Sequence, residues 1–119
     1  MDINRRVAYL TLMDVETKKS FSNLALNHHI KIHDPGSPAF IRELTYGVLE
    51  NKILLDHYID QLVKTGAASL KAADRTILRM GIYQLGFMDI RDSLVYIIKV
   101  YFNIILKICH DLGSVTHFL

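Results

Sequence analysis

The 119-residue sequence contains a single cysteine, Cys109. One cysteine cannot form a disulfide within the chain, and without a C-x-x-C pair we expect neither a zinc site nor a dithiol redox centre. No G-x-G-x-x-G or P-loop sequence is present to bind a nucleotide phosphate, and no G-x-S-x-G elbow presents a serine nucleophile. These absences predict a chain without catalytic residues, metal or cofactor, suited to a reducing cytoplasm.

Long hydrophobic runs are also scarce. The first six residues lead into an amphipathic pattern and not into the apolar region of a signal peptide. The most apolar stretch, residues 94–108, is interrupted by Lys99, Asn103 and Lys107. It is shorter than the ~20 residues that a membrane span needs. We therefore expect no export signal and no membrane partner.

The bulk composition indicates a folded domain. Half of the residues are hydrophobic and 22% are charged, which excludes a disordered tail. A second domain with its own core would need ~100 residues more, so we expect residues 1–119 to form one domain. The net charge of +2 does not by itself identify a nucleic-acid binder. The distribution of the basic residues must decide that question.

Apolar residues recur at steps of three and four, which predicts helices. Asp2, Ser22 and Asp74 are the expected N-caps of the first, second and fifth helices, and Gly66 is expected to end the fourth. No segment alternates with a period of two, so the expected fold is all-α. The predicted helices cover residues 3–17, 22–32, 38–50, 52–65, 74–87 and 93–107.

Two details of packing follow from this pattern. Phe21, just before the second helix, is expected to pack back onto Leu26 as a hydrophobic staple. The buried stripe of the fifth helix is expected to comprise Ile77, Leu78, Ile82 and Leu85.

A metal site is considered at the end of the second helix, where His28, His29, His33 and Asp34 lie close together in sequence. A pair of histidines four residues apart can chelate a metal, but a site needs three or four ligands and groups that orient them. We interpret these histidines as ordinary polar residues of a helix end.

Basic residues are the remaining functional candidates. Arginine can form two hydrogen bonds to a phosphate and can stack on an unpaired base, so clustered arginines suit RNA. Arg5 and Arg6 are expected on the helix surface, where they contribute little to folding. Solvated helix faces are the alternative, because charged residues cover every soluble helix. The candidate RNA-binding residues are Arg5, Arg6, Lys18, Lys19, Arg75 and Arg79.

Three segments, in this order and spacing, resemble the NusB superfamily. They are R-R-V-A-Y-L-T-L at residues 5–12, R-E-L-T-Y-G-V-L at 42–49 and D-R-T-I-L-R-M-G-I-Y-Q-L at 74–85. F-S-N-L-A-L-N at residues 21–27 resembles the branch that precedes the catalytic part of bacterial rRNA cytosine-5 methyltransferases more than the free-standing antitermination factors. The resemblance implies an all-α bundle of two packed helical subdomains, whose basic N-terminal face contacts RNA.

The sequence departs from the family pattern after about residue 93. The family's Asn-Glu pair is missing, and residues 115–119 resemble only the start of the last family helix. We therefore expect an incomplete final helix and an apolar groove beside it. Either further protein or a second copy of the chain, forming a homodimer, would cover this groove.

The resemblance leads to three hypotheses for function. The first is a non-catalytic domain that docks rRNA for an attached or separate methyltransferase domain, which by resemblance transfers a methyl group from S-adenosylmethionine to a cytosine. The second is a transcription antitermination factor that binds leader RNA with a ribosomal protein as partner. The third is a helical protein-interaction module without RNA, in which the basic residues would be scattered over the surface.

Overall fold

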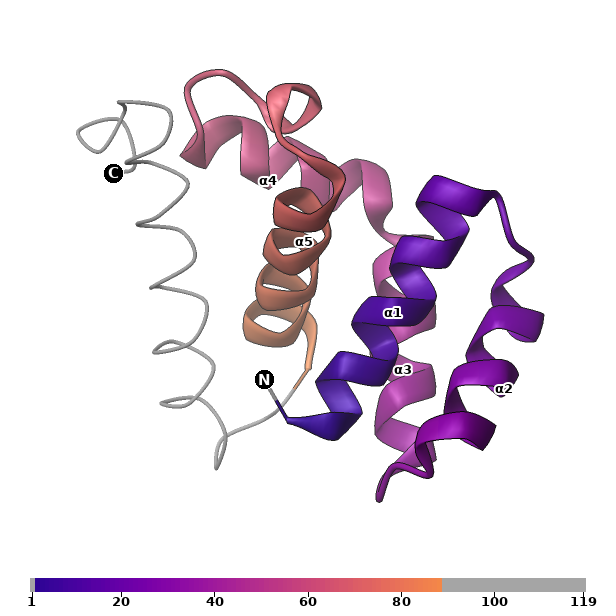
Figure 1. Cartoon of the computed structure of the whole chain (residues 1–119). Coiled ribbons are helices and arrows are strands. Elements are labelled where there is room, and N and C mark those ends of the chain that lie inside the picture. The colour runs from indigo at the N-terminus through magenta and orange to yellow at the C-terminus, as the bar shows by residue number, and fades with distance from the viewer. Residues whose placement is uncertain (1, 89–119) are drawn as a thin grey trace. The chain divides into compact units, whose positions relative to one another are not determined.

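The computed structural model describes residues 2–88 (Figure 1). This part of the chain is helical, which confirms the all-α fold class, and the helix predicted at 93–107 lies outside it. The elements are α1 (Ile3–Lys18), α2 (Ser22–His33), α3 (Pro38–Glu50), α4 (Lys52–Leu62), the short 3-10 helix η1 (Ala67–Ser69) and α5 (Ala72–Phe87).

The chain divides into two compact units, Met1–Glu50 and Asn51–Leu119. The first unit contains α1, α2 and α3, and the described part of the second contains α4, η1 and α5. The expectation of one domain over the whole chain stays a prediction.

In the first unit, α1 packs against both α2 and α3 (Figure 1). Thr11 faces this interior, and its hydroxyl donates to the carbonyl oxygen of Val7 at 2.9 Å, so the buried oxygen is not left unpaired. Burial of these side chains removes apolar area from water and stabilises the three-helix unit. The buried apolar residues are Val7, Ala8, Leu12, Ala25, Leu26, Ile41, Leu44 and Val48.

The start of α1 is fixed by two polar contacts. The carboxylate of Asp2 accepts from the Arg5 backbone N–H at 2.9 Å, which confirms Asp2 as the N-cap. The side-chain oxygen of Asn4 accepts from the Ser37 N–H at 3.1 Å, immediately before α3 begins at Pro38. The beginnings of α1 and α3 are thereby tied together.

In the second unit, α4 packs against α5 and η1. The core comprises Ile59, Val63, Ala67, Leu70 and Leu78, with Leu62 and Ile82 packed against it. The carboxylate of Asp60 accepts from the Ala67 N–H at 2.7 Å and so holds η1 against the end of α4. Gly66 provides the positive φ of 83° that this turn requires.

Several local predictions were wrong. Phe21, and not Ser22, is the N-cap of α2 and forms no side-chain capping hydrogen bond. Asp74 lies in the first turn of α5, whose N-cap is Lys71. Helix α4 ends at Leu62, three residues before the predicted end, and Gly66 lies in the following turn. These shifts of one to three residues are the usual uncertainty of cap signals.

The predicted stripe of α5 was also wrong in part. Leu78 is buried, whereas Leu85 is exposed and Ile82 is only partly buried. The buried positions instead include Thr76, Met80 and Gln84, which are spaced by four residues. No helix among residues 2–88 is long and apolar enough to span a membrane.

Candidate nucleic-acid interface

Arg5 lies at the start of α1 but not on its surface. Its side chain is 8% exposed, forms an ion pair with Asp2 and stacks over the ring of Phe40 at 5.2 Å from guanidinium carbon to ring centroid. These contacts join the first turn of α1 to α3, so the expected surface position of Arg5 was wrong. A phosphate ligand would have to compete with an ion pair and an aromatic face.

Arg79 is likewise inside the second unit. Its Nε and Nη2 donate to the two carboxylate oxygens of Asp56 at 2.6 and 2.8 Å, with 7% of its side chain exposed. This bidentate geometry is the arrangement in which arginine binds a carboxylate most strongly. The pair joins α5 to α4.

Arg75 binds backbone carbonyl groups of the same unit. Its Nη1 donates to the carbonyl oxygens of Leu70 at 2.8 Å and Ala67 at 3.3 Å. These carbonyl groups lie in and just after η1, so Arg75 holds this short helix against α5. The four-residue spacing of Arg75 and Arg79 therefore builds the fold of the second unit.

The exposed candidates are Arg6, Lys18 and Lys19, all on or next to α1. Lys18 keeps 71% of its side chain exposed although its ammonium lies 3.4 Å from Asp14. Arg6 and Lys18 are separated by about 18 Å along the helix and about 120° around it, from the helical rise and twist. They belong to opposite ends of α1 and do not form one continuous patch.

The end of α1 that carries the lysines is fastened to α2. The Nε2 of His29 lies 2.7 Å from a carboxylate oxygen of Asp14. The hydrogen bond from His29, with a smaller effect of Lys18, holds the pKa of Asp14 below its ordinary value of 3.8, against the opposing effect of burial. Because an ionised carboxylate only accepts, Nε2 of His29 carries the hydrogen.

The other histidines lie beside this contact. The rings of His29 and His33 stack at 5.9 Å between centroids, and His28 meets His29 edge to face at 5.2 Å. Asp34 is the left-handed C-cap of α2, with φ of 45°. Within residues 2–88 no three histidine, cysteine or acidic side chains come together in a metal-binding group.

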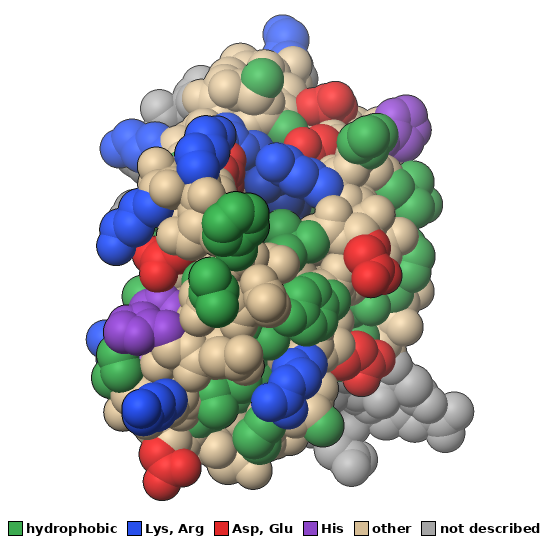
Figure 2. Space-filling view, turned by 90° about the vertical axis from the view of Figure 1, so that its right-hand side faces the viewer, with side chains coloured by type: hydrophobic (Ala, Val, Ile, Leu, Met, Phe, Trp, Pro, Cys, Tyr) green, Lys and Arg blue, Asp and Glu red, His purple; other side chains and the backbone are tan. Residues whose placement is uncertain are grey.

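The N-cap and the first turn of α2 present two exposed apolar side chains that the sequence pattern did not indicate. Phe21 is 75% exposed and Leu24 is 62% exposed, so the predicted staple onto buried Leu26 is wrong. Figure 2 shows the side of the molecule on which α2 lies in Figure 1, where hydrophobic side chains are exposed among basic, acidic and histidine side chains. The sequence carried one signal for this surface: Phe21 follows Lys18 and Lys19 closely, and an aromatic residue beside basic residues is typical of single-stranded nucleic-acid sites.

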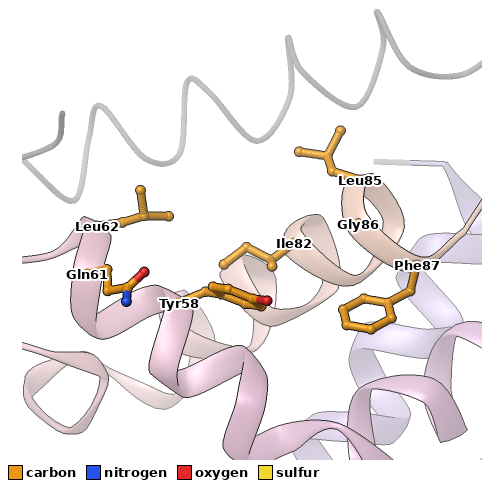
Figure 3. Close-up of a pocket in the computed structure, with 7 residues that line it drawn as sticks. All are labelled: Tyr58, Gln61, Leu62, Ile82, Leu85, Gly86 and Phe87. Atoms are coloured by element: carbon orange, nitrogen blue, oxygen red, sulfur yellow. The ribbon is translucent and has the colours of Figure 1, made fainter.

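A hollow of about 540 Å³ lies between α4 and α5 in the second unit (Figure 3). Its walls are mainly apolar, and the rings of Tyr83 and Phe87 stack next to it at 5.3 Å between centroids. The expectation that a second copy of the chain covers an apolar groove stays a prediction. The lining residues are Tyr58, Gln61, Leu62, Ile82, Leu85, Gly86 and Phe87.

The sequence matches the NusB family over residues 2–112, which is nearly the whole chain. The chain belongs to the NusB family. This membership agrees with the all-α fold and with the resemblance seen in the three sequence segments.

Similar proteins carry two different names. A probable ribosomal RNA small subunit methyltransferase B of Synechocystis is 31% identical over 87 residues, covering 71% of this chain and 20% of the relative. A transcription antitermination protein NusB of Bacillus licheniformis is 35% identical over 86 residues, covering 71% of this chain and 65% of the relative. A second probable methyltransferase B, from Bacillus subtilis, is 29% identical over 87 residues.

The matched part of the chain thus spans a fifth of the methyltransferases and just under two thirds of the antitermination proteins. No solved structure matches the chain significantly.

Proposed function

We propose that this chain is a non-catalytic RNA-binding domain that docks rRNA for an attached or separate cytosine-5 rRNA methyltransferase. The observation that carries this proposal is the family match over residues 2–112 together with relatives named as rRNA methyltransferases. The F-S-N-L-A-L-N segment at residues 21–27 supports the same branch of the family. The methyl transfer from S-adenosylmethionine would belong to the methyltransferase domain.

The proposed phosphate contacts are Arg6, Lys18 and Lys19. They are the exposed members of the predicted set, whereas Arg5, Arg75 and Arg79 form contacts within their own units. Exposed cations bind phosphate through counterion release, which needs no fixed geometry. We assign Arg5 a positioning role, because it joins the start of α1 to α3, and we assign Arg75 and Arg79 to the fold of the second unit.

The experiment is a fluorescence-anisotropy titration of the chain with hairpins of small-subunit rRNA at several salt concentrations. Replacing Arg6, Lys18 and Lys19 with Ala should weaken binding and lower the log–log salt slope by ~0.7 to 0.9 for each lost phosphate contact. Lys52→Ala, at the exposed start of α4, is the matched control and should leave the slope unchanged. Absence of RNA binding by the unmodified chain would refute the proposal and favour the protein-interaction hypothesis.

A second candidate is transcription antitermination, with leader RNA and a ribosomal protein as partners. It is favoured by the relative of 35% identity named as an antitermination protein. The two functions differ in the RNA that they need. Tight binding of leader RNA only in the presence of a ribosomal protein, with weak binding of rRNA hairpins, would select antitermination over methyltransferase docking.

A further inference from the structure

Phe21 is the most exposed aromatic side chain among residues 2–88. Leu24, one turn further along α2, is also largely exposed, so the two side chains form a small apolar surface at the beginning of this helix. Lys18 and Lys19 precede Phe21 by three and two residues, respectively, and both are exposed. An aromatic ring in water beside two cations has the composition of a single-stranded nucleic-acid site.

The backbone that carries Phe21 is held in place from both sides. On one side, the N–H of Ser20 donates to the carbonyl oxygen of Asp14 at 3.3 Å, and the N–H of Lys19 donates to the same oxygen. On the other side, the Phe21 carbonyl oxygen accepts from the Ala25 N–H at 3.0 Å. The ring is therefore presented on an ordered turn, which lowers the entropy that a ligand must overcome.

The contact between Asp14 and His29 adds to this order. It fastens the last turn of α1 to α2, the two helices that Phe21 separates. The same carboxylate lies 3.4 Å from the Lys18 ammonium, yet 71% of the Lys18 side chain stays exposed to a ligand. The turn thus combines an accessible aromatic face with cations suited to a polyanion.

We propose that Phe21 is a stacking platform for an unpaired base of the bound RNA, while Lys18 and Lys19 contact the adjoining phosphates. This inference rests on the proposed RNA-binding function and specifies the ligand as a single-stranded segment or loop. Such a base has a free π-face, whereas the bases of a duplex are stacked on one another and cannot reach a side chain. Charge complementarity selects RNA over an apolar protein partner, to which two lysines would contribute little.

The first test uses the absence of tryptophan from the sequence. A Phe21→Trp variant has one fluorophore at the proposed stacking position, and its emission should be quenched as a single-stranded RNA is added. The matched control is Ile32→Trp, placed on the last turn of the same helix at a residue that is 58% exposed. Its emission should stay constant while the RNA binds.

The second test measures affinity. Phe21→Ala should weaken binding of single-stranded RNA about five- to 150-fold, the range for loss of one stacked base, and leave duplex binding unchanged. Unchanged affinity of Phe21→Ala for single-stranded RNA, or an unquenched Phe21→Trp, would overturn the inference and point to a protein contact at this surface. If the unmodified chain binds no RNA at all, the proposed function fails, and the stacking proposal fails with it.

Discussion

The ion pair of Arg79 with Asp56 gives a sharp test of whether this arginine builds the fold or binds RNA. Arg79→Ala would remove two charge-assisted hydrogen bonds between α5 and α4. The Asp56 carboxylate would then keep its negative charge but lose these two donors. Loss of one member of a buried pair costs ~3 to 5 kcal/mol. The Asp56 side chain is 29% exposed, so water solvates part of the remaining charge and we expect the lower end, about 3 kcal/mol.

This loss is large compared with the total stability of ~5 to 15 kcal/mol for a natural domain. Urea denaturation, monitored by circular dichroism, measures this loss of stability as a shift of the unfolding midpoint to a lower urea concentration. Arg6→Ala, on an exposed position of α1, is the control and should change the free energy of unfolding by no more than ~0.5 kcal/mol. The paired replacement Arg79→Met with Asp56→Leu should restore most of the loss, because no buried charge is left alone.

RNA binding of the same variants separates the two roles. The paired replacement should bind RNA with the affinity and salt slope of the unmodified chain. The reasoning is refuted if Arg79→Ala unfolds at the same urea concentration as the unmodified chain but loses RNA affinity with a lower salt slope. Arg79 would then be a phosphate contact, as the sequence alone suggested.

Two further predictions concern the turns. Gly66→Ala should destabilise the second unit by ~1 to 2 kcal/mol, because φ is 83° and a Cβ atom would lie 3.2 Å from Asp60 Oδ1; an unchanged thermal midpoint would contradict this strain. The lowered pKa of Asp14 contributes stability that is present above pH 3.8 and is lost as the pH falls through the folded-state pKa. Asp14→Asn should therefore weaken the acid dependence of unfolding below that pH, and an identical acid profile would show that the contact with His29 contributes nothing.

The elements of the first unit could be predicted closely, because their signals are local. Asp2 and Pro38 mark the beginnings of α1 and α3 through their own backbone chemistry, which does not depend on the rest of the fold. The cap of α5 was misplaced for the opposite reason. Asp74 is a good N-cap by type, but the helix begins two residues earlier, at Ala72, with Lys71 as N-cap. A cap preference is worth only ~1 kcal/mol, so packing of the segment can override it.

The buried stripe of α5 shows why apolar spacing was insufficient. The stripe at Thr76, Met80 and Gln84 has helical spacing but contains two polar residues, so a count of apolar positions passes over it. Gln84 is 1% exposed, and its amide donates to the carbonyl oxygen of Met80 at 3.0 Å. A satisfied polar group can be buried at little cost, but its partner is known only once the helix has formed.

The roles of the arginines could not be predicted for the same reason, because their partners are known only once the fold has formed. A step of four residues places Arg75 and Arg79 one turn apart on α5, and this spacing is equally suited to two phosphates or to two partners inside the protein. Those partners, the Leu70 carbonyl oxygen and the Asp56 carboxylate, lie five and 23 residues away in sequence. Arg5 is similar, since Phe40 reaches it only through the packing of α3 on α1. The guanidinium group is the side chain best suited both to phosphate and to buried carboxylate, so residue type cannot separate the two roles. For Arg6, Lys18 and Lys19 it is their exposure, more than their charge, that makes them the better candidates for RNA contact.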